Sequence, residues 1–302
     1  MNKIVRIFKD PFYAVWKLLV KTSPHIKSDR MYIMLDTFLM TRRFPKLDNP
    51  KTYNDKVNWL KLNFKQPEYT EWVDKYKAKI LAEKIIGKDH IIPTLGVWDS
   101  FDDIDFNSLP RQFVLKTTHD SGGVVICEDK LKFNIDAARK KINSSLNRNW
   151  YYIHREYPYK TCERKIIAEQ FLTDGSIHGL VDYKFFCFNG VPKMVYVGSA
   201  RMGKQQLDHF DMDFNLLPFE RHFKHADVTP KKPASFESMK ALAKKLSRGF
   251  LHVRVDLYDI NGHLYFGELT FFPGAGIRPF NPKDWDYKVG EWLELPSSNQ
   301  GG

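Results

Sequence analysis

The stretch RVDLYDINGHLYFGELTFFPGAG, residues 254–276, decides the fold class of this chain. Two apolar runs flank Asn261-Gly262, a dipeptide that is typical of the tight turn in a β-hairpin. Side chains alternate between the two faces of a strand, so Arg254 and Asp256 share the face opposite the apolar residues. The sequence therefore predicts an antiparallel hairpin with one apolar face and one charged face.

The register of this hairpin determines whether Glu268 reaches the same face as Asp256. A strict two-residue turn would pair Asp256 with Gly267 and send Glu268 to the other face. One extra residue pairs the two acids directly, so we predict a three-residue turn or a bulge near residues 261–263. The charged face then carries two carboxylates, a guanidinium and a hydroxyl, which belong to Asp256, Glu268, Arg254 and Thr270.

Two carboxylates this close repel each other unless a cation lies between them. Mg²⁺ binds a few carboxylate oxygens together with nucleotide phosphates, so Asp256, Glu268 and the Thr270 hydroxyl are candidate metal ligands. Arg254 then suits a phosphate or another anion. The spacing alone is also compatible with an exposed hairpin face on which Arg254 pairs with one acid.

A second candidate site follows the apolar strand that ends at Lys116 in FVLKTTHDSGG, residues 113–123. Glycine lets backbone N–H groups approach a phosphate closely, which makes Ser121, Gly122 and Gly123 candidate phosphate contacts. His119 is either a further contact or a hydrogen-bonding residue of the loop. No GxxxxGK[ST] motif occurs, and an ordinary hairpin loop with a solvated lysine accounts for the same pattern.

Two further strands carry polar side chains of interest. In IIAEQFL, residues 166–172, Glu169 comes at the end of an apolar segment, where it is placed to meet a purine amino group or ribose hydroxyls. In VDYKFF, Lys184 shares a strand face with Asp182 and is a second candidate for an anionic substrate group. A rim acid and a solvated strand face explain these two patterns as well.

Composition restricts the class of partner. The chain of 302 residues has 47 Lys and Arg against 36 Asp and Glu, a net charge of +11, which favours anionic partners. Its three cysteines are widely spaced and form no CxxC pair, so we expect neither a disulfide framework nor a zinc cluster. No apolar run reaches the roughly 20 residues needed to cross a bilayer, and we expect a soluble, cytoplasmic protein.

Helical patterns dominate the N-terminal part. The basic, apolar start predicts a helical pair that packs on the body, or alternatively a helix that lies on an anionic membrane surface. Residues 70–86 predict one helix with Thr70 as its N-cap and Gly87 as its C-terminal stop. The last six residues predict a disordered tail.

The order of these features is similar to that of the ATP-grasp superfamily, and specifically of the TupA-like ATP-grasp proteins encoded with surface-polysaccharide biosynthesis. The resemblance covers roughly residues 45 to 295. Six segments carry it in this order: DKYKAKILAEKIIG, FVLKTTHDSGG, IIAEQFL, DYKFFCFNGVPK, KPASFESMKALAKKLS and the stretch quoted first.

The resemblance implies an α+β, ATP-grasp fold, in which two α+β subdomains clamp a nucleotide, and ATP and Mg²⁺ as cofactors. On this basis we expect a helical region at 1–72, a lid and central subdomain at 73–173 and a catalytic subdomain at 174–302. The departures are Thr270, where many ATP-grasp enzymes have Asn, and the helical first 70 residues, which do not match the α/β domain that usually precedes this fold.

The resemblance also implies roles for particular residues. Lys116, with Lys75 or Lys79, would contact the ATP phosphates under the loop that contains His119. Asp256 and Glu268 match the acids that bind the metal, and Arg254 faces the transferred phosphoryl group together with Lys184. The hinge around adenine would consist of Glu169, Gln170, Phe171 and Leu172.

The activity implied is that of a carboxylate–amine ligase, which phosphorylates a carboxylate to an acylphosphate that an amine then attacks. The expected substrates are a uronic acid of a capsular or cell-wall glycan and an amino acid or other amine. Contact with the inner membrane or the polysaccharide assembly machinery is a further expectation. Two alternatives stay open: a kinase or glycosyltransferase acting on the same glycan, and a basic nucleic-acid-binding protein, although no known nucleic-acid-binding signature occurs.

Overall fold

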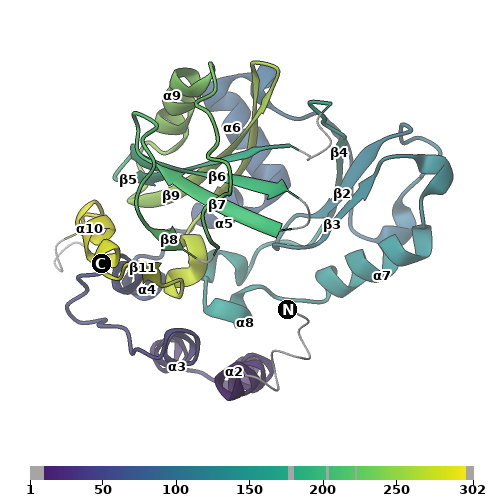
Figure 1. The fold of residues 1–302 in the computed structure, drawn as a ribbon. Helices are drawn as coiled ribbons and strands as arrows, with labels where there is room; N and C mark the ends of the chain where they lie inside the picture. Colours follow the sequence, from purple (N-terminus) through teal and green to yellow (C-terminus); the bar gives the residue numbers. More distant parts are fainter. Residues whose placement is uncertain (1–9, 176–179, 202–203, 222, 297–302) are drawn as a thin grey trace.

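The computed structural model of this chain describes residues 10–175, 180–201, 204–221 and 223–296. The start of the expected helical pair, residues 1–9, and the expected tail, residues 297–302, lie outside the described residues. Within the described part, two antiparallel sheets and their helices form a mixed α+β molecule, as expected (Figure 1).

The smaller sheet has four antiparallel strands in the order β1-β4-β2-β3. Its strands are β1 (Thr94–Trp98), β2 (Phe113–Thr117), β3 (Val124–Cys127) and β4 (Ile166–Gln170). Helix α7 (Ile135–Leu146) packs against β2 and β3 and buries Ala138 and Ile142 with Phe113 and Leu115. This sheet therefore has a hydrophobic core of its own.

The larger sheet has five antiparallel strands in the order β10-β9-β5-β6-β7. Its strands are β5 (Asp182–Phe188), β6 (Val191–Arg201), β7 (Lys204–Phe210), β9 (His252–Ile260) and β10 (His263–Thr270). Alternating apolar residues such as Val253, Val255 and Leu257 are fully buried in the largest core, which also contains residues of helix α9 (Phe236–Leu246). The opposite face of β9 remains for polar side chains.

The β9–β10 hairpin corrects one prediction. Ile260 pairs with His263 across a strict two-residue turn at Asn261-Gly262, where φ is 53° and 89°. The extra residue is instead Gly267, because the register shifts between Phe266 and Glu268. Asp256 still pairs with Glu268 as predicted, but through a bulge inside β10 and not through the turn.

The helix predicted over residues 70–86 is two helices, α5 (Tyr69–Val73) and α6 (Lys75–Ile86). Asp74 separates them, because its side chain caps α6 by accepting hydrogen bonds from the backbone N–H groups of Tyr76 and Lys77. Thr70 is therefore inside α5 and not an N-cap, whereas α6 ends before Gly87 as predicted. Ala78 and Ala82 of α6 lie in the core of the larger sheet.

The remaining elements complete the described part of the chain. They are α2 (Pro11–Thr22), α3 (Asp29–Thr41), α4 (Tyr53–Asn63), α8 (Tyr151–His154), α10 (Asp284–Glu291), a two-stranded ribbon of β8 (Glu220–Arg221) and β11 (Phe280–Asn281), and six short 3-10 turns: Ser23–His25, Lys88–His90, Phe101–Asp103, Lys130–Lys132, Tyr157–Tyr159 and Pro273–Gly276. None of the helices in the described residues is both long and apolar enough to span a bilayer. Helix α4 packs against the turn that follows β10 and against α10.

Candidate active site

A charged face forms where β5, β9 and β10 lie side by side. Lys184 on β5 is opposite Asp256 on β9, and Asp256 is opposite Glu268 on β10. Arg254 is two residues before Asp256 and opposite Thr270. Because paired residues of antiparallel strands point to the same face, the four side chains predicted to share the hairpin face do so, and Lys184 joins them.

Asp256 is held by two cations. Arg254 Nε and Nη2 donate to its Oδ1 and Oδ2 at 2.6 and 2.7 Å, and Lys184 Nζ donates to Oδ2 at 2.7 Å. Asp256 is 1% exposed, and burial alone would raise its pKa, but Arg254 and Lys184 outweigh burial and lower the pKa. The carboxylate is therefore ionised, and Asp256 in turn raises the pKa of Lys184 against the effect of burial.

Glu268 is the more open of the two acids, with its side chain 40% exposed. Its Oε1 accepts hydrogen bonds from Arg254 Nη2 and from the Thr270 hydroxyl, both at 3.2 Å. No described residue contacts Oε2 through a hydrogen bond or an ion pair. An open oxygen on Glu268 beside an ionised Asp256 is a donor set that fits Mg²⁺ when phosphate oxygens complete the coordination.

The protein groups alone do not form a full metal cage. In the described part of the chain, no group of three or more His, Cys, Asp or Glu side chains gathers in a geometry that could hold a metal ion. Arg254 and Lys184 now serve as the counter-ions of the acids. The Thr270 hydroxyl donates a hydrogen bond to Glu268 and thereby supports that carboxylate.

A second charged cluster lies at the end of β4. Glu169 Oε1 accepts from Lys79 Nζ of α6 at 2.8 Å, and Oε2 pairs with Lys116 Nζ of β2 at 2.5 Å. Burial alone would raise the pKa of Glu169, but Lys116 and Lys79 outweigh it and hold the pKa at about 2. One carboxylate and two lysines leave this cluster with a net positive charge.

A cavity of about 530 Å³ borders the Glu169 cluster and reaches Asp182, which pairs with Lys184 of the charged face at 3.3 Å. The predicted segment Glu169, Gln170, Phe171 and Leu172 lines it together with Lys116, and Asp182 and Tyr258 of the larger sheet complete the lining on the other side. Val114 and Val124 add apolar surface. A largely apolar slot with a lysine at one end has the size and chemistry of a nucleotide site.

The loop between β2 and β3 is built around Asp120 and does not line this cavity. Asp120 accepts hydrogen bonds from Gly123 N at 3.3 Å and from the hydroxyls of Thr117 and Ser145. Its backbone carbonyl also accepts from Lys75 Nζ. Of the two lysines left open by the sequence, Lys79 therefore lies at Glu169, whereas Lys75 holds the loop.

The other predicted loop residues have separate positions. His119 is 1% exposed and its Nε2 lies 3.0 Å from the backbone oxygen of Arg148, and burial lowers its pKa. Ser121 and Gly122 are exposed at the tip, and Gly123 is buried beneath it. The structure thus places His119 inside the loop and not beside the cavity. Of the site residues predicted in the stretch 113–123, only Lys116 lines the cavity.

Sequence reasoning missed a buried guanidinium on the same face. Arg221 of β8 is 5% exposed, and its guanidinium lies 4.8, 6.0 and 5.0 Å from the ring centroids of Tyr53, Phe186 and Phe280. Phe186 is opposite Arg254, so Arg221 lies next to the charged face. A strand of two residues has no periodicity to reveal it, so the sequence offered no signal for this residue.

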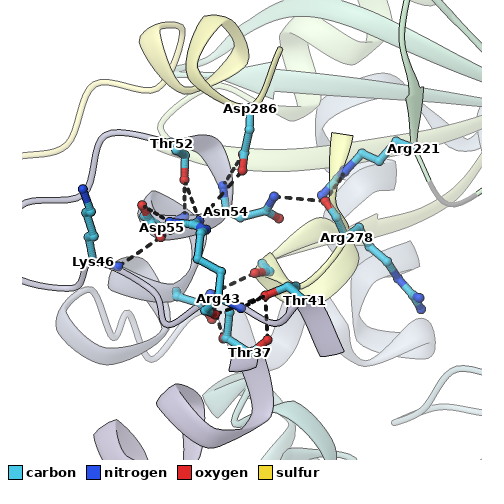
Figure 2. Close-up of polar contacts among 12 residues, drawn as sticks. Thr37, Thr41, Arg43, Lys46, Thr52, Asn54, Asp55, Arg221, Arg278 and Asp286 are labelled. Atoms are coloured by element: carbon cyan, nitrogen blue, oxygen red, sulfur yellow. Dashed lines mark hydrogen bonds and ion pairs between the residues drawn. The ribbon is translucent and has the colours of Figure 1, made fainter. Parts of the chain in front are cut away.

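Helix α4 anchors the backbone beside Arg221 (Figure 2). Asn54 Nδ2 donates at 3.0 Å to the backbone oxygen of Arg278, which also accepts from Arg221 Nε at 3.4 Å. On the other side of α4, Arg43 forms a bidentate pair with Asp55 at 2.9 and 3.2 Å. The N-terminal helices are thus tied through α4 to the segment that follows β10.

Comparison with known proteins gave one family match and several similar folds. A D-alanine–D-alanine ligase from Helicobacter pylori is 15% identical, with a TM-score of 0.44 over 82% of this chain and 70% of that one. A D-alanine–D-alanine ligase from Bacillus anthracis complexed with ATP is 16% identical, with a TM-score of 0.37 over 67% of this chain and 54% of that one. A D-cycloserine synthetase is 18% identical, with a TM-score of 0.39 over 76% and 72%.

No curated protein matched the chain. The family model of TupA-like ATP-grasp proteins matches residues 55–294, which include both sheets and both charged clusters. A match over most of the chain establishes the family that the six segments indicated. The chain therefore belongs to the TupA-like ATP-grasp family, and it has the ATP-grasp fold of ATP- and Mg²⁺-dependent ligases that form carbon–nitrogen bonds.

Proposed function

We propose that this protein joins the carboxylate of a uronic acid in a surface polysaccharide to an amino acid or another amine. The reaction consumes ATP, takes place in the cytoplasm and proceeds through an acylphosphate of the uronic acid. The observation that carries the proposal is that the cavity lies next to the charged face: it is lined by Lys116 and Asp182, and Lys184 pairs with Asp182 at 3.3 Å and with Asp256 at 2.7 Å. A nucleotide in the cavity would have its phosphates directed toward the two acids.

The cations of the site are suited to phosphoryl transfer, which depends on positioning and charge neutralisation more than on covalent help. Lys116 lines the cavity, and Lys184 and Arg254 lie on the charged face. All three side chains form ion pairs with carboxylates of the site, so they are already oriented when an anion arrives. They stabilise the negative charge on the transferred phosphoryl group and on the acylphosphate.

Asp256 and Glu268 are the residues that would hold Mg²⁺. When bound, the ion supplies charge neutralisation for the phosphate oxygens of ATP. The chain's own contribution is to keep Asp256 ionised through Arg254 and Lys184, and to place Glu268 opposite it through the bulge at Gly267.

The surroundings of Arg221 favour an anionic acceptor. A buried charge is ordinarily paired, yet no carboxylate of the described residues forms an ion pair with this guanidinium. Its bonds go to the backbone oxygens of Pro273 and Arg278 at 3.3 and 3.4 Å, which satisfy hydrogen bonds but do not neutralise a full charge. A carboxylate of the acceptor glycan would provide the missing counter-charge beside Arg254. The net charge of +11 favours the same class of acceptor.

The test is to incubate the protein with ATP, Mg²⁺, a uronic-acid oligosaccharide and a mixture of amino acids, and to search for an amide adduct by mass spectrometry. Phosphate release should depend on the amine. The same assay with Arg221→Gln should show a higher KM for the oligosaccharide and an unchanged KM for ATP. Transfer of phosphate to the glycan without any amine would instead identify a kinase, and turnover with neutral glycans alone would exclude the uronic acid.

A further inference from the structure

Exposed apolar side chains are concentrated in the N-terminal helices. Six of the sixteen exposed large apolar residues in the described part of the chain fall between residues 12 and 44. They are Phe12 at 38%, Val15 at 52%, Leu18 at 61%, Met31 at 50%, Leu35 at 37% and Phe44 at 50% exposure, and we call them the outer face. Scattered single apolar residues are normal on a protein surface, but a contiguous group marks a binding site.

The outer face is additional to the side of each helix that already packs inward. Helix α2 buries Tyr13, Trp16 and Leu19, and α3 buries Tyr32 and Ile33. A helix that packs by one stripe normally presents polar residues on the other side. Here the exposed side of α2 and α3 also carries large apolar residues among its polar ones. The folding of this chain does not require these exposed side chains to be apolar.

Ring contacts join the two helices into one surface. The Phe12 ring of α2 lies 6.0 Å from the Phe38 ring of α3, and Phe38 stacks on Phe44 at 4.5 Å. Helices α2 and α3 pack directly against each other. In Figure 1 both helices lie at the edge of the molecule, apart from the two sheets. A large flat partner can therefore reach the outer face without covering the cavity.

Carboxylates near the outer face have partners. Asp10 pairs with Arg42, Asp29 pairs with Arg155, and Asp36 Oδ2 lies 2.9 Å from His154 Nδ1. By contrast, three exposed lysines form no ion pair with a carboxylate of the described residues. They are Lys17, Lys21 and Lys27. Residues 1–9 of the sequence add Lys3, Arg6 and Lys9 and contain no Asp or Glu.

We propose that the outer face binds an anionic phospholipid surface. An apolar patch beside unpaired lysines matches the boundary between acyl chains and negatively charged headgroups, where apolar residues insert and lysines remain at the surface. A second copy of this chain is a poorer partner, because it would bring a second set of lysines against the first. This interaction is independent of the ligase reaction and would hold the cleft close to membrane-linked substrates.

The test uses the full chain and sedimentation with vesicles. Vesicles of phosphatidylcholine and phosphatidylglycerol in equal parts should bind the protein, and phosphatidylcholine alone should not. The variant Lys21→Ala/Lys27→Ala should bind about 30-fold more weakly, and high salt should have a similar effect. The variant Val15→Ser/Leu18→Ser should lose roughly tenfold or more in affinity, since both side chains are exposed in the free protein.

A matched control separates the outer face from general apolarity. Ile126→Ser/Leu131→Ser changes Ile126 of β3, which is 57% exposed, and Leu131 of the 3-10 turn Lys130–Lys132, which is 87% exposed, and it should bind vesicles like the unaltered protein. Equal vesicle binding by the Val15→Ser/Leu18→Ser variant would overturn the proposal. So would a dimer in sedimentation equilibrium that the same two substitutions dissociate, because a second copy would then occupy the face.

Discussion

At the scale of single residues, Arg254 determines the state of the charged face. It bonds both Asp256 and Glu268, and it is one of two cations on Asp256, so the two acids sit side by side without uncompensated repulsion. An incoming phosphate competes for the same guanidinium. Loss of Glu268, the more exposed of the two acids, should therefore affect the chemistry more than the fold.

We expect Glu268→Gln to lower kcat by about 100-fold or more while leaving the melting temperature within a few degrees, since one well-placed charged group is typically worth that much in rate. The measurement is ADP release at saturating ATP and Mg²⁺, with thermal unfolding in parallel. Glu237→Gln is the control, because that glutamate also pairs with a lysine but lies on α9 with its side chain 65% exposed. Full activity of the Glu268 variant would remove it from the metal site.

Glu156 gives a pH-dependent prediction. It is 7% exposed, and burial raises its pKa to about 7, with Asp36 adding to the increase against His154, Lys61 and Arg254. A carboxyl group whose pKa is higher in the folded protein than in the unfolded protein favours the folded state most when it is protonated. Stability therefore falls as pH rises from about 4.5 to about 7, by about 3 kcal/mol in total.

Glu156→Gln mimics the protonated acid, so the variant should not lose this stability. Its melting temperature should match the unaltered protein near pH 5 and exceed it by about 5 °C at pH 8. Thermal unfolding across that pH range measures the difference. A difference that is constant with pH would show that Glu156 does not titrate in this window.

At the scale of elements, the sequence predicted the charged strands well because period-two alternation leaves little choice of face. It located the extra residue of the hairpin in the turn, whereas Asn261-Gly262 already forms an ideal two-residue turn and the bulge falls at Gly267. A glycine inside a strand is the usual mark of a bulge, so the signal was present in the sequence. Asp256 pairs with Glu268 whether the extra residue lies in the turn or at Gly267.

Long-range contacts explain what the sequence could not reveal. No pattern in the chain indicates that Glu169 lies between Lys79 and Lys116, because the three residues come from three different elements. Asp74 interrupts the predicted helix by capping α6, a local signal that apolar periodicity concealed. Loop residues were predicted from composition alone, which cannot separate the buried His119 from the exposed Ser121.

The loop after β2 provides a prediction at this scale. A Cβ at position 123 would lie 2.9 Å from Asp120 Oδ1 and closer still to the hydroxyls of Thr117 and Ser145. Gly123→Ala should therefore break the loop's hydrogen bonds, destabilise the protein by about 1–3 kcal/mol and raise the KM for ATP by displacing Lys116. Chemical denaturation and ATP kinetics measure the two effects, and Ser121→Ala at the exposed tip is the control. An unchanged KM would show that the loop does not position Lys116.

At the scale of the whole molecule, Lys61 joins three parts of the chain. It lies in α4, is 1% exposed, and donates at 2.9 Å to the backbone oxygens of both His154 and Ala275. Lys61→Met would leave two buried carbonyl groups without a donor. We expect a loss of about 2–5 kcal/mol in the free energy of unfolding by urea. The control is Lys65→Met, since the Lys65 side chain is 50% exposed, and equal losses in the two variants would contradict the prediction.

Three side chains of one helix, Asn54, Asn58 and Lys61, each hold a different backbone carbonyl group in residues 275–278. A segment held at three points cannot easily change its shape, so residues 275–278 form a fixed wall beside Arg221. If the proposed cleft opens and closes, the movement would come from the four-stranded sheet, which has a hydrophobic core of its own. Under the proposed function, this fixed segment would determine which acceptor binds, and the rate of turnover would depend on the movement of the four-stranded sheet.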